Sequence, residues 1–282
     1  MTTLEESYAA CRALNRRHGT TYYWAGFVMP RVTRHHVWAL YAFCRYADEI
    51  VDAPTWPSVE ARRVALERFS DRFFTDLAAG HSDHLILRAV VHTARAFDLG
   101  ADLFRRFLRS MAMDLTTTHY ETYDDLRVYM DGSAAVIGEM MLPLLEPSSD
   151  EAVESARALG EAFQLTNFLR DVGEDLGRGR VYLPREDLRA FDVDPRSRCV
   201  DDRWRALMRF EIDRARSLYA RAERGIRWLP PSSTRCIRTA SRLYGGILDE
   251  IERNDYDVFR TRARVPARRK ASAVALAMLA RR

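Results

Sequence analysis

The chain has 282 residues, of which 47% are hydrophobic and 30% are charged, and its formal net charge is +4. This length supports one large core or two modest domains. Gly (13) and Pro (10) are sparse and helix-forming residues dominate, which argues against a strand-rich fold and favours a helical one. The charge forms no basic block in the body of the chain, and no nucleic-acid motif is present, so we expect no nucleic-acid partner.

The cysteines and the two terminal segments indicate the cellular compartment of the protein. The four cysteines are far apart in the sequence, which argues against a zinc site or a disulfide framework. Residues 1–17 contain no apolar signal region. The apolar tail at residues 271–280 is about half as long as a bilayer-spanning helix. We therefore expect a cytoplasmic protein whose tail leaves a peripheral membrane contact open.

Helix-like patterns, separated by short breaks, run along the whole chain. Breaks fall at "DAPTWPS" (52–58), "LEPSSD" (145–150), "GRGRVYLP" (177–184) and "WLPPSS" (228–233), with Ser148 or Ser149 as an expected N-cap. No repeat or long linker appears, which predicts one all-α domain over residues 1–282. The expected helices are 4–17, 32–51, 58–79, 83–97, 101–117, 123–145, 149–176, 203–228, 232–254 and 267–279.

The helix expected at 32–51 carries a narrow polar stripe on an apolar body. Tyr41, Arg45, Asp48 and Asp52 follow at i, i+4, i+7 and i+11. At 100° per residue they share an arc of roughly 60°. Most other residues of this helix are Ala, Leu, Phe, Tyr, Ile or Val, so the polar stripe is the exception on its surface.

The helix expected at 149–176 repeats this pattern. Gln164, Asn167, Asp171 and Asp175 follow at i, i+3, i+7 and i+11, within an arc of about 80°, and Arg170 lies beside them. One Asp-x-x-x-Asp pair is usually a surface feature. Two pairs, each extended into an eleven-residue stripe, are much harder to explain in that way.

Both helices invert the usual amphipathic pattern, which has a narrow apolar stripe on a polar body. We therefore expect them to be buried on most sides, with the stripes facing an internal polar space. Carboxylates in such a space need cations. Oxygen ligands suit Mg²⁺, which shares its shell with substrate phosphates, and arginines match phosphate oxygens. Together the stripes predict a Mg²⁺–diphosphate site inside a helical bundle.

Four blocks of the chain resemble one enzyme family. They are residues 18–52, 111–145, 159–184 and 244–265, and the third contains "NFLRDVGEDLGRGRVYLP". They are similar to the squalene and phytoene synthases, trans-isoprenyl diphosphate synthases that join two prenyl diphosphates head to head. "GSAAVIGEMMLP" and "YDVF" are most similar to bacterial phytoene synthases. The resemblance implies an isoprenoid-synthase helical bundle around a central cavity.

The resemblance also implies roles for individual residues. Asp48, Asp52, Asp171 and Asp175 would be the catalytic aspartates, holding Mg²⁺ or Mn²⁺ together with Asn167. A wider set of residues would bind the substrate diphosphates: His18, Thr21, Tyr41, Arg45, Gln164, Asn167, Arg170, Tyr244 and Arg262. Six apolar residues are candidates for the cavity lining, although residues of these types more often fill an ordinary core: Phe27, Met29, Phe43, Met140, Met141 and Leu142.

The implied reaction joins two geranylgeranyl diphosphates through a cyclopropyl intermediate to phytoene, with release of diphosphate and no use of NADPH. A carotenoid desaturase would take the product onward. The alternatives are squalene or dehydrosqualene synthesis from farnesyl diphosphate, and a non-catalytic scaffold, although scaffolds usually lose the aspartates. Glu49 replaces a second Asp found in many members, and Thr20 and Thr21 replace a Lys/Ser pattern of the dehydrosqualene branch. Cavity depth, and with it prenyl chain length, depends on packing that the sequence does not reveal.

Overall fold

The computed structural model describes residues 2–279 apart from 19–28, 30 and 54. The described residues are mostly helical, with a single isolated bridge between His119 and Val181, which confirms the expected all-α class. Four short elements are η1 (Asp131–Ala135, π-helical) and three 3₁₀ turns, η2 (Pro143–Leu145), η3 (Pro195–Ser197) and η4 (Arg224–Trp228). The α-helices are α1 (Leu4–His18), α3 (Arg31–Asp52), α4 (Val59–Ala79), α5 (Leu87–Ala96), α6 (Ala101–Met113), α7 (Tyr123–Met130), α8 (Val136–Met141), α9 (Ala152–Gly177), α10 (Arg185–Ala190), α11 (Asp202–Glu223), α12 (Pro231–Arg253) and α13 (Ala267–Leu279).

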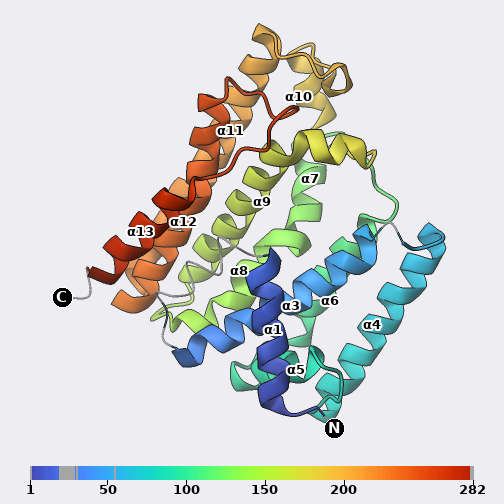
Figure 1. The fold of residues 1–282 in the computed structure, drawn as a ribbon, viewed down its shortest axis with the longest axis vertical. Helices are drawn as coiled ribbons and strands as arrows, with labels where there is room; N and C mark the ends of the chain where they lie inside the picture. The colour runs from blue at the N-terminus through green and yellow to red at the C-terminus, as the bar shows by residue number, and fades with distance from the viewer. Residues whose placement is uncertain (1, 19–28, 30, 54, 280–282) are drawn as a thin grey trace.

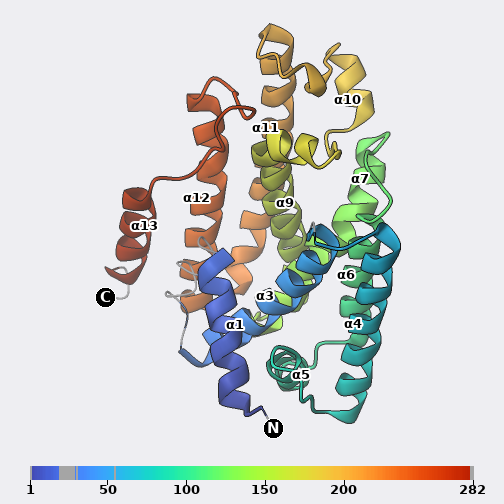
Figure 2. The same cartoon turned by 45° about the vertical axis from the view of Figure 1, so that its right-hand side comes forward.

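Helix α9 runs through the middle of the bundle in both views (Figures 1 and 2). It packs against α8, η1, α11 and α12. Its buried residues follow helical spacing at Ala158, Ala162, Leu165, Leu169 and Val172. Since partners surround most of the helix, its polar stripe has to face an internal space, as the inverted pattern predicts.

The apolar interior divides into two main clusters. One joins α1, α3, α4, α5 and α6, and the other joins α7, α9, α11 and α12. Phe43 lies in the first cluster, fully buried, with ring centroids 4.7 Å from Phe73 and 5.2 Å from Phe104. The two polar stripes thus belong to helices of different clusters, α3 and α9.

The helix predicted at 123–145 is interrupted in the structure. It consists of α7, the π-helical segment η1, α8 and η2. An ion-pair network holds the interruption: Arg106 of α6 and Arg157 of α9 each donate to Asp131 and Glu139. The extra residue of the π-turn depends on these partners from distant helices, so hydropathy along the segment does not reveal it.

Other helix boundaries also differ from the predictions. Helix α9 begins at Ala152, and Ser149 accepts from the backbone of Glu151 (3.2 Å) instead of capping the helix. Helix α10 and the η3 turn were not predicted, because both are too short to show a clear period. Residues 98–102 form the expected turn and helix start, with Gly100 at the N-cap of α6.

One described helix, Tyr123–Leu145, is long and apolar enough to cross a membrane by composition, with a mean hydropathy of 1.2. More than half (56%) of the 18-residue stretch that carries this hydropathy is buried inside the protein. Its apolar residues are therefore explained by their place in the core of the bundle.

We predict opposite effects on stability from two glycine substitutions within α9. A Cβ at Gly160 would lie 2.2 Å from the carbonyl oxygen of Ala134 in η1, whereas a Cβ at Gly177 would meet nothing within 4 Å. Gly160→Ala should lower the free energy of unfolding by about 1–3 kcal/mol because backbone must move. Gly177→Ala should be neutral or raise it by up to about 1 kcal/mol. Urea denaturation checks both; equal effects would contradict the close helix approach.

Candidate active site

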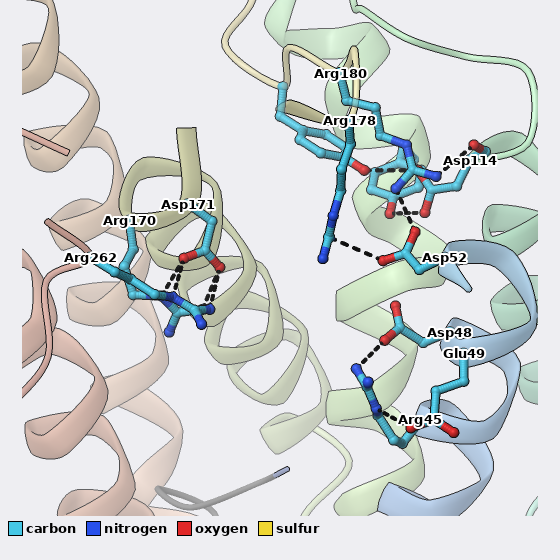
Figure 3. A network of polar contacts seen from close by, with 12 residues as sticks. Arg45, Asp48, Glu49, Asp52, Asp114, Arg170, Asp171, Arg178, Arg180 and Arg262 are labelled. Carbon is cyan, nitrogen blue, oxygen red and sulfur yellow. Dashed lines mark hydrogen bonds and ion pairs between the residues drawn. The ribbon is translucent and has the colours of Figure 1, made fainter. Parts of the chain in front are cut away.

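A polar cavity with a volume of about 1210 Å³ lies between α3 and α9. Both predicted stripes line it in full. Figure 3 shows carboxylates and arginines of the two walls pointing toward the space between them. The structure therefore brings the eight stripe residues to one cavity: Tyr41, Arg45, Asp48, Asp52, Gln164, Asn167, Asp171 and Asp175.

The α3 wall pairs its carboxylates with Arg45. The Nη1 atom of Arg45 donates to Asp48 (2.6 Å) and its Nε atom donates to Glu49 (3.0 Å). His18 approaches Glu49 at 3.7 Å. The Asp48 side chain remains 43% exposed because it faces the cavity. Its enclosure raises the pKa to about 6, with Asp52 adding to the rise and Arg45 opposing it.

Two arginines reach across the cavity to Asp52. Arg180 donates to one carboxylate oxygen (2.7 Å) and Arg178 donates to the other (3.2 Å). Both follow the end of α9, so these ion pairs join the two walls (Figure 3). Sequence reasoning treated this segment only as a helix end. Two arginines directly after a pair of aspartates were the signal that it missed.

On the α9 wall, Asp171 is held by two arginines. Arg170 donates to its two oxygens at 2.7 and 2.5 Å, and Arg262 does so at 2.7 and 2.8 Å. Burial alone would raise the pKa of Asp171, but the bonds from both arginines hold it below its usual value. Arg262 lies between α12 and α13, so this contact ties the C-terminal segment to the cavity.

Asp175, one turn further along α9, differs sharply from Asp171. Among the described residues, no hydrogen bond or ion pair reaches its carboxylate. Burial raises its pKa to about 7, Asp171 adds to the rise, and Arg178 and Arg180 oppose it. About two turns earlier on α9, the buried Oδ1 of Asn167 has no hydrogen-bond partner among the described residues. These two acceptors are available to cations that enter the cavity.

A fifth aspartate of the cavity was missed from the sequence. Asp114, after α6, accepts from Tyr129 (2.6 Å) and Tyr182 (3.0 Å), and burial raises its pKa to about 6. Lys270 of α13, the only lysine in the chain, also lines the cavity. Asp114 and Lys270 do not lie at a helical spacing from the stripes. The single lysine among 44 basic residues was nonetheless a feature that the sequence analysis could have noted.

The remaining predicted residues have mixed positions. His18, Arg170, Tyr244 and Arg262 line the polar cavity. Thr21 and Phe27 lie outside the described residues. The functional roles of all these residues stay predictions.

An apolar cavity of about 290 Å³ adjoins the polar one. Among the expected lining residues, Met29, Met140, Met141 and Leu142 lie in its wall, whereas Phe43 belongs to the core alone. Five residues border both spaces, which makes them one continuous site with a polar section and an apolar section: Tyr41, Cys44, Phe107, Ser133 and Gln164.

The two acidic walls stand apart in this structure. No three His, Cys, Asp or Glu residues of the described chain lie close enough together to hold a metal ion. Aspartate and asparagine side chains of both walls nonetheless offer oxygen donors, which include the Asp175 carboxylate and the Asn167 Oδ1 that no described residue hydrogen-bonds. Such donors suit a hard cation whose shell other ligands complete.

Comparison with known proteins identifies the family and the fold. A family model described as squalene/phytoene synthase matches residues 15–269. The chain belongs to the squalene/phytoene synthase family. It is accordingly a prenyltransferase.

Relatives of this family cover almost the whole chain. The chain is 39% identical to a 15-cis-phytoene synthase of Synechococcus elongatus, covering 99% of this chain and 94% of the relative. A 15-cis-phytoene synthase of Synechocystis is 40% identical, covering 95% and 83%.

Solved structures of the family share the fold. A squalene synthase of Alicyclobacillus acidocaldarius superposes with a TM-score of 0.81 at 29% identity, covering 90% of this chain and 96% of that one. A ligand-bound dehydrosqualene synthase reaches 0.87 at 25% identity, covering 98% and 97%.

We predict opposite effects on stability from neutralising two aspartates of α9. The raised pKa of Asp175 means that the folded state binds more protons than the unfolded chain, so this group costs stability as pH rises from about 4 to 7. Asp175→Asn should raise the free energy of unfolding by roughly 2–4 kcal/mol at pH 8, and by less toward pH 4.5.

Asp171→Asn should instead destabilise the protein at pH 8, because two arginines lose their charged partner. Urea denaturation with a chelator present measures both variants. Equal gains from Asp175→Asn at both pH values, or a gain from Asp171→Asn, would contradict the electrostatics described.

Proposed function

We propose that this prenyltransferase joins two geranylgeranyl diphosphates head to head to form phytoene, in carotenoid biosynthesis. The observation that carries the proposal is the continuous site, in which carboxylates and arginines surround a polar section that opens into an apolar one. Diphosphates suit the first section and prenyl chains suit the second. The relatives named 15-cis-phytoene synthase, which align over nearly the full chain, favour this substrate and product.

Five oxygen-bearing residues of the two walls would hold Mg²⁺, or Mn²⁺ in its place: Asp48, Asp52, Asn167, Asp171 and Asp175. When bound, the ions supply Lewis-acid neutralisation of the departing diphosphate. The carboxylates come from opposite walls, so a diphosphate between them would complete the metal shell. That arrangement accounts for acids that surround the cavity without forming a compact cluster.

The arginines would exchange partners when substrate binds. In the free protein, Arg178 and Arg180 neutralise Asp52, and Arg170 and Arg262 neutralise Asp171. A diphosphate offers oxygens that match guanidinium geometry, so the arginines would turn to it and leave the carboxylates free to hold a metal ion. Further diphosphate contacts would come from His18, Thr21, Tyr41, Arg45, Gln164 and Tyr244.

The proposed chemistry needs the apolar section. A C1–O bond breaks and its electron pair leaves with diphosphate, which creates an allylic cation. A double bond of the second substrate attacks that cation, and proton loss closes the cyclopropane. A second ionisation, rearrangement and proton loss yield phytoene, so two diphosphates and two protons leave in total. The apolar walls keep water from the cations, and no reductant is needed.

Two alternative functions differ from this one, the first in its substrate and the second in lacking catalysis. The same site would accept farnesyl diphosphate, giving squalene or dehydrosqualene, and the solved neighbours carry those names. A non-catalytic scaffold is disfavoured because all four aspartates are present and line one cavity.

The product is an apolar hydrocarbon, so it has to leave toward a membrane or another apolar site. We propose that the protein works in the cytoplasm, where its basic and apolar C-terminal segment contacts a membrane surface. There a carotenoid desaturase would receive the product.

The test is incubation with each prenyl diphosphate and Mg²⁺, with and without NADPH, followed by product mass. We expect phytoene from geranylgeranyl diphosphate, unaffected by NADPH. A product only from farnesyl diphosphate, or one that requires NADPH, would replace the proposal by the squalene branch.

Asp48→Asn and Asp171→Asn should each lower turnover on the order of 100-fold or more, since each removes a carboxylate from one wall. Asp98→Asn is the matched control: Asp98 lies outside the cavity, and Asn tolerates its positive φ of 51°. Full turnover by either wall variant would contradict the proposed roles of the aspartates.

A further inference from the structure

Asn15 of α1 is a buried polar side chain with nothing to bind. Its exposed fraction is 0%, and neither Oδ1 nor Nδ2 has a hydrogen-bond partner among the described residues. Leaving such a group unsatisfied costs about 1–3 kcal/mol. An apolar side chain of similar size would fit the fold better, so the carboxamide requires an explanation outside folding.

The residue borders the site already described. Asn15 lies in the wall of the apolar section, together with Met29 and Val37. Like Gln164, it brings an amide dipole into a lining that consists mostly of Ala, Leu, Ile, Met and Phe. The walls provide little screening, so a dipole there acts strongly on a nearby charge.

Contacts between α1 and α3 place Asn15 along the length of the site. Arg12 stacks over Trp38, with 5.3 Å to the ring centroid, and His18 lies 3.7 Å from Glu49. Asn15 is midway between Arg12 and His18, which sets it level with the middle of α3. That stretch contains Tyr41 and Cys44, which border both sections. Asn15 therefore lies near the junction between diphosphate and prenyl chain.

We propose that the Asn15 carboxamide oxygen stabilises the carbocation that forms when an allylic C–O bond breaks at this junction. The inference rests on the proposed function, because it requires a prenyl cation in the apolar section. The uncharged prenyl chain offers the amide no hydrogen bond, so the interaction arises only when positive charge develops. An interaction confined to the charged state lowers the barrier without tightening substrate binding.

The amide has no competing partner to lose. Turning its oxygen toward the cation breaks no hydrogen bond to the part of the chain that the structure describes, since neither end of the group is bonded there. The diphosphate-binding arginines act on the leaving group in the polar section. Asn15 would act on the opposite charge, from the apolar side.

Two variants of equal shape isolate the oxygen. Asn15→Val and Asn15→Thr differ only by a methyl group in place of a hydroxyl, so they leave nearly the same volume in the cavity. Threonine keeps an oxygen dipole and valine does not. Binding is measured for two non-reactive probes: a geranylgeranyl chain ending in a tertiary ammonium, which mimics the cation, and its neutral carbon isostere, both with Mg²⁺ and inorganic diphosphate.

We expect Asn15→Val to lower the preference for the ammonium probe about tenfold, equal to 1.4 kcal/mol, and Asn15→Thr to lower it by less. The neutral probe should bind all three proteins alike, which also verifies the fold. An unchanged preference in Asn15→Val would overturn the inference. Binding of neither probe to the unmodified protein would instead overturn the proposed function.

Kinetics and stability give an independent readout. Asn15→Val should lower kcat about tenfold with KM nearly unchanged, while its thermal midpoint stays equal or rises because an unsatisfied polar group is removed. A purely structural Asn15 would give the reverse, namely a lower midpoint and an unchanged kcat.

Discussion

Carboxylates on buried helix faces need cations, and this requirement organises the site. Asp171 is held by Arg170 and Arg262, and Asp52 is held by Arg178 and Arg180. These arginines come from α9, from the segment after it and from the segment before α13, and all four line the polar cavity whose walls they neutralise. Asp175 has no such arginine partner among the described residues, and its burial raises its pKa. In the proposed function, metal and diphosphate would take the place of these ion pairs.

The walls stand where they do because α3 and α9 belong to different apolar clusters. Each helix uses most of its surface to pack against its own neighbours and turns its polar stripe toward the other. Close backbone contact between α9 and η1 fixes one side of the apolar section: a side chain at Gly160 would collide with the Ala134 carbonyl oxygen. Packing of this kind sets the depth of the cavity, and depth in turn limits the length of the prenyl chain.

Helical period was sufficient to predict the all-α class and the eight stripe residues, because both depend on positions along single helices. Asp114, Arg178 and Arg180 escaped prediction because they lie outside helices and reach the cavity only through the fold. The π-turn at Asp131–Ala135 escaped for a related reason: it depends on arginines from α6 and α9. Asn15 showed no distinctive pattern, and only its burial and missing partners revealed it.

The central claim is that the two walls act together only when cation and diphosphate are both present. Calorimetric titration of the substrate-free protein with Mg²⁺, alone and then with saturating inorganic diphosphate, tests it most directly. The account predicts weak binding of Mg²⁺ alone, because arginines occupy Asp52 and Asp171, and much tighter binding once diphosphate is added. Equal Mg²⁺ affinity in both titrations would contradict it, and so would diphosphate binding that remains as tight in the presence of a chelator.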